Sequence, residues 1–408
     1  MNLPRRSSAA PRIIYVVGTV DTKAPELGFL CDTLRTAQGA GSEFVRLINL
    51  STQTADDSGD VTARQVAQFH PDGATAVLGL SDRGQAVAAM AAAFANFLPT
   101  LPDIAGIIGI GGGGGTAMIT PGLRALPYGV PKLMISTLAS GNTAPYVGIS
   151  DLIMMPAVTD LAGLNSLNRV ILHNAAQAML GMIANPAPKT TTIPALGLTM
   201  FGVTTPCVSA IAAALPDYDC QVFHATGTGG QTMEKLAESG LLTGFFDITT
   251  TEVADLICGG VLSCLDDRFG AAARTGLPWV GSVGALDMVN FGAPDTVPTH
   301  YKGRLFYHHN PQVTLMRTTP AECHAIGTWI AERLNLCDGA IRLLLPRGGV
   351  SSLDTPGGAF YDPAANDALF AALESTLRQT PNRQVIRLPH HINHPAFAAA
   401  CVAAFRNI

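Results

Sequence analysis

Short apolar runs alternate with longer amphipathic stretches along the first half of this chain. The short runs are predicted to be β-strands, and each is followed by glycine or polar residues before the next apolar stretch. We expect six strands, at 13–17, 44–50, 74–80, 104–110, 131–137 and 151–155, and helices at 25–37, 86–98, 116–125 and 160–183. Strands that alternate with helices in this way predict right-handed βαβ units and a parallel sheet.

The same alternation restarts after a stretch rich in proline and threonine at 185–194. That stretch has no periodicity, so we predict a linker there, between a first domain at 12–184 and a second at 195–408. Strands of the second domain are predicted at 195–201, 220–224, 245–248, 279–282, 304–307, 340–345 and 385–388. Residues 1–11 are predicted to be a loose leader, since no apolar segment of a signal peptide follows Arg5 and Arg6. The fold class is α/β, with two Rossmann-like, doubly wound parallel-sheet domains.

Composition narrows the class of protein. Hydrophobic residues make up 48% and charged residues 13%, a balance typical of membrane proteins or of parallel sheets buried on both faces. No run of about 18 apolar residues occurs, which favours a soluble protein without a membrane partner. The net charge of -5, with no more than two basic neighbours anywhere, argues against a nucleic-acid partner. Eight scattered cysteines without a CxxC pair predict reduced thiols and a cytoplasmic location.

Five consecutive glycines, Gly111–Gly115, lie between a predicted strand and the helix that begins at Thr116. Such a loop offers backbone N–H groups and the positive end of a helix dipole, with no Cβ atoms to keep phosphate oxygens away. The formal GxGxxG at Gly109, Gly111 and Gly114 does not open the first βα unit, and the Lys-Ser/Thr pair of a Walker A loop is missing. The alternative is a tight turn under close packing, although five glycines lose much backbone entropy for a turn alone.

Polar side chains follow several other predicted strands, at the edge where open parallel sheets bind ligands. Lys23, which follows Asp21 and Thr22, and Arg83 would neutralise phosphate charge. Asp160 would hold a ribose hydroxyl or a Mg²⁺ ion. The remaining candidates carry hydroxyl groups and are Thr52, Thr116, Ser136, Thr137 and Ser140. Each candidate has an alternative as a helix cap or a surface residue, but their common edge favours a binding site.

The second half carries its own glycine loop, at Gly227–Gly230. Asp287, Asn290 and Arg317 add polar groups between apolar strands, which suggests a pocket for a small-molecule substrate. The alternative is that such residues cap helices, as the Ser/Thr-x-x-Glu patterns at 249–252 and 319–322 indicate. No template for a catalytic site is present, neither GxSxG nor HExxH nor the kinase motifs, so the catalytic residues stay unassigned. The histidines at 390, 391 and 394 have no acidic partner at metal-ligand spacing and are interpreted as surface or interface residues.

Several stretches together resemble one known family. They lie at 18–23, 109–116, 131–165, 224–234, 284–296 and 309–319. Over residues 12–406 the chain resembles the bacterial relatives of the N-terminal portion of the tomato mosaic virus resistance protein, an uncharacterised family with an ATP-binding label. The resemblance implies two Rossmann-like subdomains, ATP held by the first, and a homodimer. A TIM-barrel region follows in the plant protein, so a separate TIM-barrel protein is an expected partner. Gly113 stands where the family commonly has serine.

We therefore expect a nucleotide-binding protein of unknown cellular role, with ATP held at the carboxyl edge of the first sheet. Backbone amides of Gly111–Gly115 would hold phosphates, and Lys23 and Arg83 would be the countercharges. The alternative is an enzyme that acts on a phosphorylated or carboxylated small metabolite at a cleft between the domains. A binding protein would leave ATP intact, whereas an enzyme would turn over some cosubstrate.

Overall fold

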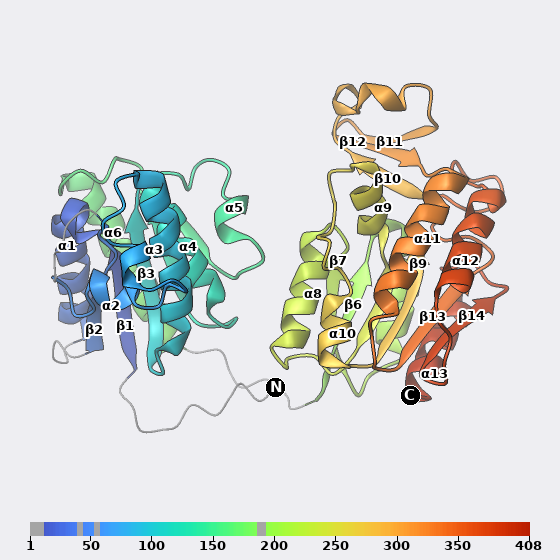
Figure 1. Ribbon diagram of the computed structural model, residues 1–408, viewed down its shortest axis with the longest axis horizontal. Coiled ribbons are helices and arrows are strands. Elements are labelled where there is room, and N and C mark those ends of the chain that lie inside the picture. The colour runs from blue at the N-terminus through green and yellow to red at the C-terminus, as the bar shows by residue number, and fades with distance from the viewer. Residues whose placement is uncertain (1–11, 39–43, 53–57, 186–192) are drawn as a thin grey trace. The chain divides into compact units, whose positions relative to one another are not determined.

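The computed structural model describes residues 12–38, 44–52, 58–185 and 193–408. The chain divides into two compact units, one on either side of residues 189–190. Each unit contains its own parallel sheet with helices on both faces, so the α/β, Rossmann-like fold class is confirmed (Figure 1). The predicted leader and most of the predicted linker, at 1–11 and 185–194, lie outside the described residues.

A five-stranded sheet forms the centre of the N-terminal unit, in the order β2-β1-β3-β4-β5. All four strand pairings are parallel. The two central strands β1 and β3 are buried along their whole length because helices cover both faces of the sheet. The strands are β1 (Ile13–Gly18), β2 (Val45–Asn49), β3 (Ile104–Gly111), β4 (Lys132–Ser136) and β5 (Ile153–Pro156).

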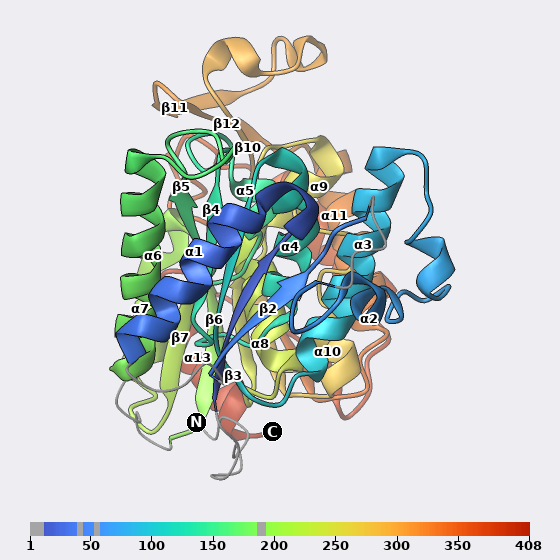
Figure 2. The ribbon, with the colours of Figure 1, turned by 90° about the vertical axis from the view of Figure 1, so that its left-hand side faces the viewer.

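Two pairs of helices cover this sheet. α1 (Val20–Gln38) and α6 (Ser166–Ala184) pack on one face, and α3 (Arg83–Phe97) and α4 (Gly113–Ala125) pack on the other (Figure 1, Figure 2). Shorter elements are α2 (Ala63–Ala67), α5 (Ala144–Val147) and two 3₁₀ turns, η2 (Ala74–Ala76) and η3 (Leu98–Thr100). None of the helices that the described residues form is long and apolar enough to cross a membrane.

The prediction of a strand at 74–80 is wrong. Residues Ala74–Ala76 form a 3₁₀ turn, and the glycines on either side, Gly73 and Gly79, have φ values of 81° and 100°. Such left-handed positions bend the chain and break an extended run. The apolar character of the run reflects Val77, which is buried under α3 without entering the sheet. The crossover from β2 to β3 is consequently long and carries α2 and α3.

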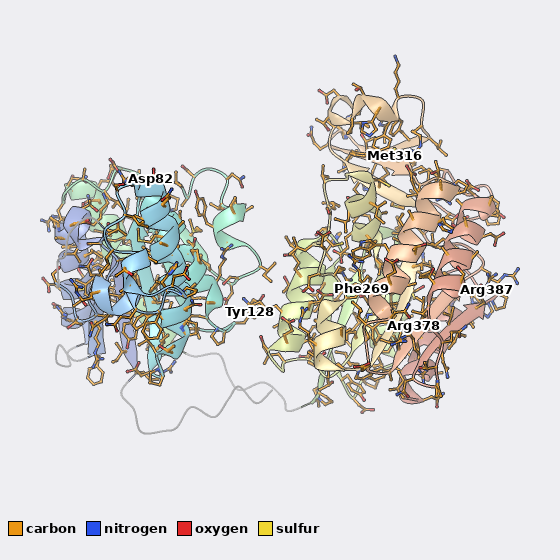
Figure 3. The ribbon with its side chains drawn as sticks, viewed as in Figure 1. Asp82, Tyr128, Phe269, Met316, Arg378 and Arg387 are labelled. Atoms are coloured by element: carbon orange, nitrogen blue, oxygen red, sulfur yellow. The ribbon has the colours of Figure 1, made fainter. Side chains whose placement is uncertain are left out.

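The C-terminal unit contains a six-stranded parallel sheet in the order β14-β13-β9-β8-β6-β7. α7 (Thr205–Ala213) and α13 (Pro395–Arg406) cover one face. The helices on the other face are α8 (Thr228–Glu238), α10 (Gly270–Thr275), α11 (Pro320–Leu334) and α12 (Pro363–Thr376) (Figure 1), while α9 (Thr251–Cys258) follows β8. Phe269 lies inside this unit against Trp279 and Trp329 (Figure 3). The strands are β6 (Ala195–Met200), β7 (Asp219–His224), β8 (Phe245–Thr249), β9 (Trp279–Gly284), β13 (Ile341–Pro346) and β14 (Arg383–Leu388).

A three-stranded antiparallel sheet, which the sequence pattern did not predict, is added to the C-terminal unit. It consists of β10 (Met288–Phe291), β11 (Phe306–Asn310) and β12 (Val313–Arg317), in the order β10-β12-β11. The strand predicted at 304–307 overlaps the beginning of β11, at 306–307, so it belongs to this sheet and not to the parallel one. The connection from β10 to β11 forms two 3₁₀ turns, η5 (Pro294–Thr296) and η6 (Thr299–Tyr301), beyond the antiparallel sheet (Figure 1).

Candidate functional site

The order of strands in the N-terminal sheet creates a crevice between β1 and β3. From β1 the chain moves outward to β2, then returns past β1 to β3 and continues to β4 and β5. The loop after β1 therefore leads to α1 on one face, and the loop after β3 leads to α4 on the other. Open α/β sheets bind their ligands at such a switch point, outside the carboxyl ends of the strands.

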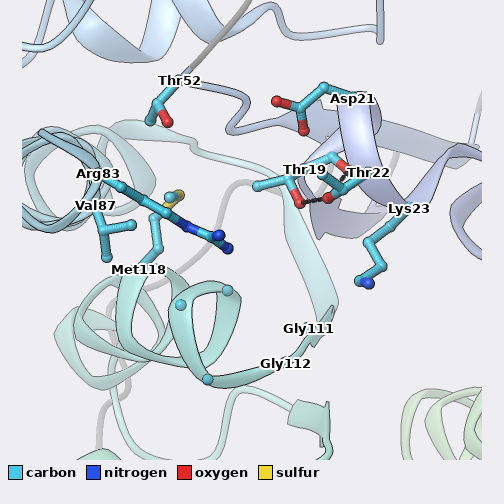
Figure 4. Close-up of a pocket in the computed structure, with 13 residues that line it drawn as sticks. Thr19, Asp21, Thr22, Lys23, Thr52, Arg83, Val87, Gly111, Gly112 and Met118 are labelled. Atoms are coloured by element: carbon cyan, nitrogen blue, oxygen red, sulfur yellow. Dashed lines mark hydrogen bonds between the residues drawn. The ribbon is translucent and has the colours of Figure 1, made fainter. Parts of the chain in front are cut away.

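A cleft of about 450 Å³ lies at this switch point (Figure 4). Its volume falls within the range of about 300–1,000 Å³ that is typical of small-molecule sites. The lining comes from the residues after β1, the residue Thr52 after β2, the start of α3 and the glycine run after β3. The lining residues are Thr19, Asp21, Thr22, Lys23, Thr52, Arg83, Val87, Gly111, Gly112, Gly113, Gly114, Gly115 and Met118.

The protein's own packing explains the first glycine of the run but not the four that follow. A Cβ atom at Gly111 would come within 2.9 Å of the Cα atom of Gly115, which is too close. From Gly112 to Gly115, a Cβ atom would lie 3.6–3.9 Å from its nearest neighbours, an ordinary contact, and none of these residues has a positive φ. Neither crowding nor a left-handed backbone therefore calls for glycine here, whereas close approach of a ligand would.

Helix α4 begins within this glycine run. Gly112 is its N-cap residue, and no described side chain caps the helix. The first N–H groups of a helix have no acceptor within the helix, and they carry the positive end of the helix dipole. Because glycines form the first turn of α4, these N–H groups can be approached by a bulky anion such as phosphate.

Two basic side chains flank the glycine turn (Figure 4). Arg83 is the first residue of α3, whose N-cap Asp82 (Figure 3) accepts the N–H of Gln85 at 2.8 Å. Arg83 is exposed and forms no ion pair with a described residue of its unit. Lys23 lies at a kink of α1, with φ −130° and ψ 18°, and its ammonium group donates to the carbonyl of Leu161. An ammonium group has three donors, so Lys23 can bind a ligand as well.

Thr116 and Ser136 lie in the interior of the unit, where they support the glycine run, and they do not line the cleft. The Thr116 hydroxyl donates to the carbonyl of Gly112 at 2.8 Å and lies 2.6 Å from the Ser136 hydroxyl. Ser136 in turn accepts the N–H of Leu138 at 3.0 Å. Both side chains are buried, so their contribution is to fix the position of the turn.

Three other predicted site residues lie outside the lining of the cleft. Thr137 follows β4, and its N–H donates to the carbonyl of Gly111 at 3.4 Å. Ser140 lies in the exposed turn after β4. Asp160 follows β5, and its carboxylate accepts the N–H of Leu161 at 2.8 Å. All three are on the predicted edge of the sheet, but β4 and β5 are farther from the switch point than β1 and β3.

The sequence pattern did not single out Thr19, Val87 and Met118, which also line the cleft. Thr19 follows β1 directly, and its hydroxyl lies 2.6 Å from that of Thr22. Val87 and Met118 are apolar and lie one helical turn after Arg83 and Gly114. The spacing of four residues places each pair on one face of its helix, and this periodicity is the signal that could have identified them.

Close packing accounts for the second glycine loop. Gly227 has a φ of 81°, and its N–H donates to Glu252 at 2.8 Å. A Cβ atom at Gly229 would lie 1.9 Å from the carbonyl oxygen of His224, and one at Gly230 would lie 2.2 Å from the carboxylate of Glu252. Glycine is therefore required at these positions by the fold itself.

Glu252 belongs to a buried ionic cluster that the sequence did not predict. The guanidinium of Arg268 lies 3.0 Å from Glu234, 2.7 Å from Asp247 and 2.5 Å from Glu252. Burial raises the pKa of Glu234 to about 7, although Arg268 acts in the opposite direction. Trp279 adds a hydrogen bond from its indole N–H to Asp247 at 3.2 Å. The cluster joins α8, β8 and α9 inside the C-terminal unit.

Asp287, Asn290 and Arg317, suggested as a substrate pocket, are all at most 4% exposed. Asp287 accepts the hydroxyl of Ser351 at 2.7 Å, and Arg317 donates to the carbonyl of Phe360 at 2.7 Å. The amide of Asn290 donates to the Asp255 carboxylate at 3.1 Å. Burial raises the pKa of Asp287 to about 7, despite the nearby positive charge of Arg317. Most of these polar groups thus bond to other parts of the C-terminal unit, whereas one carboxylate oxygen of Asp287 and the amide oxygen of Asn290 have no hydrogen-bond partner among the described residues.

Comparison with known proteins assigns nearly the whole chain to one family. Models for the N-terminal and C-terminal domains of the uncharacterised protein family UPF0261 match residues 12–188 and 193–408. A UPF0261 protein of Mesorhizobium japonicum is 62% identical over 97% of this chain and 98% of its own length. One from Clostridium tetani is 40% identical, with 97% and 98% covered. The ToMV resistance protein Tm-1(GCR237) of Solanum lycopersicum is 42% identical over 98% of this chain, which corresponds to 56% of the tomato protein.

Proposed function

This chain belongs to the uncharacterised protein family UPF0261, and we propose that it binds ATP, or a similar nucleotide, in the cleft between β1 and β3. The observation that carries this proposal is the glycine turn at Gly112–Gly115, for which the protein's own packing gives no reason. The turn begins a helix that no described side chain caps, and it is flanked by Lys23 and Arg83. A ligand with several phosphate groups would account for all three features together.

Each part of the lining has a role in this proposal. The glycine N–H groups at the start of α4 bind phosphate oxygens. The guanidinium of Arg83 pairs with two oxygens at once, and Lys23 contributes a point charge beside them. Val87 and Met118 provide the apolar part of the lining, which suits the base. Thr116 and Ser136 keep the turn in place.

Asp21 is the residue to which we assign Mg²⁺ binding, in place of Asp160. Asp21 carries a carboxylate in the lining of the cleft, whereas Asp160 lies outside the lining. Mg²⁺ is usually held by one or two carboxylates together with the phosphates of the substrate. When bound, the ion supplies further neutralisation of phosphate charge. Thr19 and Thr22 lie beside Asp21 and offer hydroxyl groups.

Thermal unfolding with ATP, ADP, GTP or NAD, each with Mg²⁺, tests the proposal. A ligand at about 100 times its Kd stabilises the folded state by roughly 2.7 kcal/mol, which raises Tm by a few degrees. We expect ATP to raise Tm, and Arg83→Gln to abolish the increase. Arg64→Gln, an exposed change on α2 outside the lining, is the matched control and should keep it. No shift with any nucleotide, or equal shifts in both variants, would refute the proposal.

An enzyme that acts on a phosphorylated or carboxylated metabolite stays the alternative. Chromatography of ATP after incubation with the protein for hours separates the two functions, because a binding protein leaves the nucleotide intact.

We further propose a cytoplasmic location, supported by eight cysteines that are all free thiols. A homodimer and a separate TIM-barrel partner are proposed from the resemblance to the tomato protein, and light scattering of the purified chain tests the first of these.

A further inference from the structure

We propose that the C-terminal unit carries a second small-molecule site, beneath the connection from β10 to β11, for a compact apolar molecule with one anionic group. A pocket of about 240 Å³ lies here, between one face of the antiparallel sheet and the connection. Its outer wall is formed by Pro294, Val297 and Pro298. This site is independent of the proposed nucleotide cleft, which lies in the other unit.

The register of the antiparallel sheet determines which side chains face this pocket. His308 pairs with Thr314 and Phe306 pairs with Met316, so these four residues share one face of the sheet. Phe306, His308 and Thr314 line the pocket. Residues on the opposite face pack on the body of the unit, where Leu315 belongs to a cluster with Phe360. The pocket is therefore built into the way the connection folds back over the sheet.

The hydroxyl group of Thr314 is the main evidence that this pocket binds a ligand. It is 1% exposed, and its hydroxyl has no hydrogen-bond partner among the described residues. A buried hydroxyl without a partner is unfavourable, and valine would fill the same space in a central strand without that cost. A ligand atom that accepts a hydrogen bond from Thr314 explains why a hydroxyl lies at the pocket.

Charge and size limit the ligand. Lys302 lies at the pocket, and no Asp or Glu is among the described residues that line it, which favours a single anionic group on the ligand. Pro294, Val297 and Phe306 favour an apolar body. The volume of about 240 Å³ is roughly half that of the nucleotide cleft, so a molecule smaller than a nucleotide fits. A small aromatic or branched aliphatic carboxylate has these properties.

Titration by ¹⁹F NMR with 4-fluorobenzoate as the probe, and 4-fluorobenzyl alcohol as its neutral counterpart, tests this site in the full chain. We expect 4-fluorobenzoate to bind more tightly than the alcohol. Thr314→Val should weaken binding of the carboxylate at least tenfold, because it removes a hydrogen bond to a charged group. Lys302→Met should weaken binding of the carboxylate several-fold and leave that of the alcohol unchanged.

Controls separate loss of the site from loss of the fold. Thr314→Val should keep or raise Tm, since it removes an unpaired hydroxyl and preserves shape. Arg83→Gln, in the other unit, should leave binding of 4-fluorobenzoate unchanged. Absence of binding up to about 10 mM, beyond the millimolar range of weak ligands, would overturn the proposal. Equal affinities in wild type, Thr314→Val and Lys302→Met would overturn it too, because the probe would then bind elsewhere.

Discussion

At the scale of residues, the two glycine loops show that glycine can occur at a position for different physical reasons. Gly229 and Gly230 are glycine because a Cβ atom would overlap the protein itself. Gly112 and Gly114 face no such overlap, and their missing side chains leave room in the cleft. The sequence identified both loops but could not separate the two causes, because the difference lies in atoms that come from distant segments.

Substituting alanine at two neighbouring glycines should separate packing from binding. Gly111→Ala places a methyl group against the backbone of Gly115, and overpacking of this kind costs about 1–3 kcal/mol of folding free energy. Among the described residues, the methyl group of Gly114→Ala meets Arg83 and Val87 alone, at 3.9 Å, so the change should be neutral or stabilise the helix by up to about 1 kcal/mol. Urea unfolding of both variants measures the difference. Equal destabilisation by the two changes would show that the whole run is required by packing.

Asp287 should make the C-terminal unit less stable as pH rises. Its folded pKa of about 7 lies above the unfolded value of about 3.9, because burial disfavours the charged form. Between these values the folded state holds a proton that the unfolded state has lost, so the free energy of unfolding falls with increasing pH. The stabilisation is complete below about pH 4 and is lost as pH passes through about 7, a change of a few kcal/mol.

Urea unfolding across this pH range tests whether Asp287 causes the loss of stability with increasing pH. Asp287→Asn cannot titrate and should therefore reduce the slope of stability against pH. Glu234 and Asp255, with pKa values raised by burial to about 7 and about 6, act in the same direction and should leave a residual slope. An unchanged slope in Asp287→Asn would show that ionisation of Asp287 does not cause this dependence on pH.

At the scale of elements, the Arg268 cluster joins α8, β8 and α9 through one guanidinium group. Arg268→Met would leave three carboxylates buried around an uncharged side chain, and breaking a buried ion pair in this way costs about 3–5 kcal/mol. Arg274→Met is the matched control, because Arg274 is half-exposed and pairs with Glu238 and Asp267 near the surface. That change should cost at most about 1 kcal/mol. Similar losses on urea unfolding would mean that the cluster does not join these elements as proposed.

The parallel sheets could be predicted because short, mainly apolar runs mark most of their strands and helices separate these runs regularly. The run at 74–80 looks the same in sequence, but its glycines take left-handed conformations and bend it out of the sheet. The antiparallel sheet was not predicted because the expected strand at 304–307, which overlaps β11, was placed in the parallel sheet, and because β10 and β12 are short runs of four and five residues that contain polar side chains. Both errors concern segments whose structure depends on surrounding elements.

Only part of the candidate site was predicted correctly, again because the arrangement depends on distant elements. Lys23, Thr52, Arg83 and Gly111–Gly115 line the cleft, because they follow β1, β2 and β3 or begin α3. Ser140 and Asp160 follow β4 and β5 and lie outside its lining. A sequence shows which residues end strands, whereas the strand order decides which of those ends lie at the switch point.

At the scale of the whole molecule, each unit has its own sheet and hydrophobic cores, and the division between the units lies near residues 189–190. We therefore expect calorimetry to resolve two unfolding transitions. A nucleotide that binds the N-terminal unit should raise the temperature of one transition and leave the other unchanged. Equal displacement of both transitions by ATP would show that binding stabilises the two units together.

Isothermal titration calorimetry of Mg²⁺–ATP with the wild type and with Gly114→Ala tests whether the glycine turn binds the nucleotide. We predict one site per chain in the wild type and an affinity at least tenfold lower in Gly114→Ala, with folding stability retained. A methyl group at residue 114 obstructs the turn that binds phosphate while leaving the rest of the fold intact. No binding by the wild type, or equal affinity in the two proteins, would show that the glycine turn is not a nucleotide site.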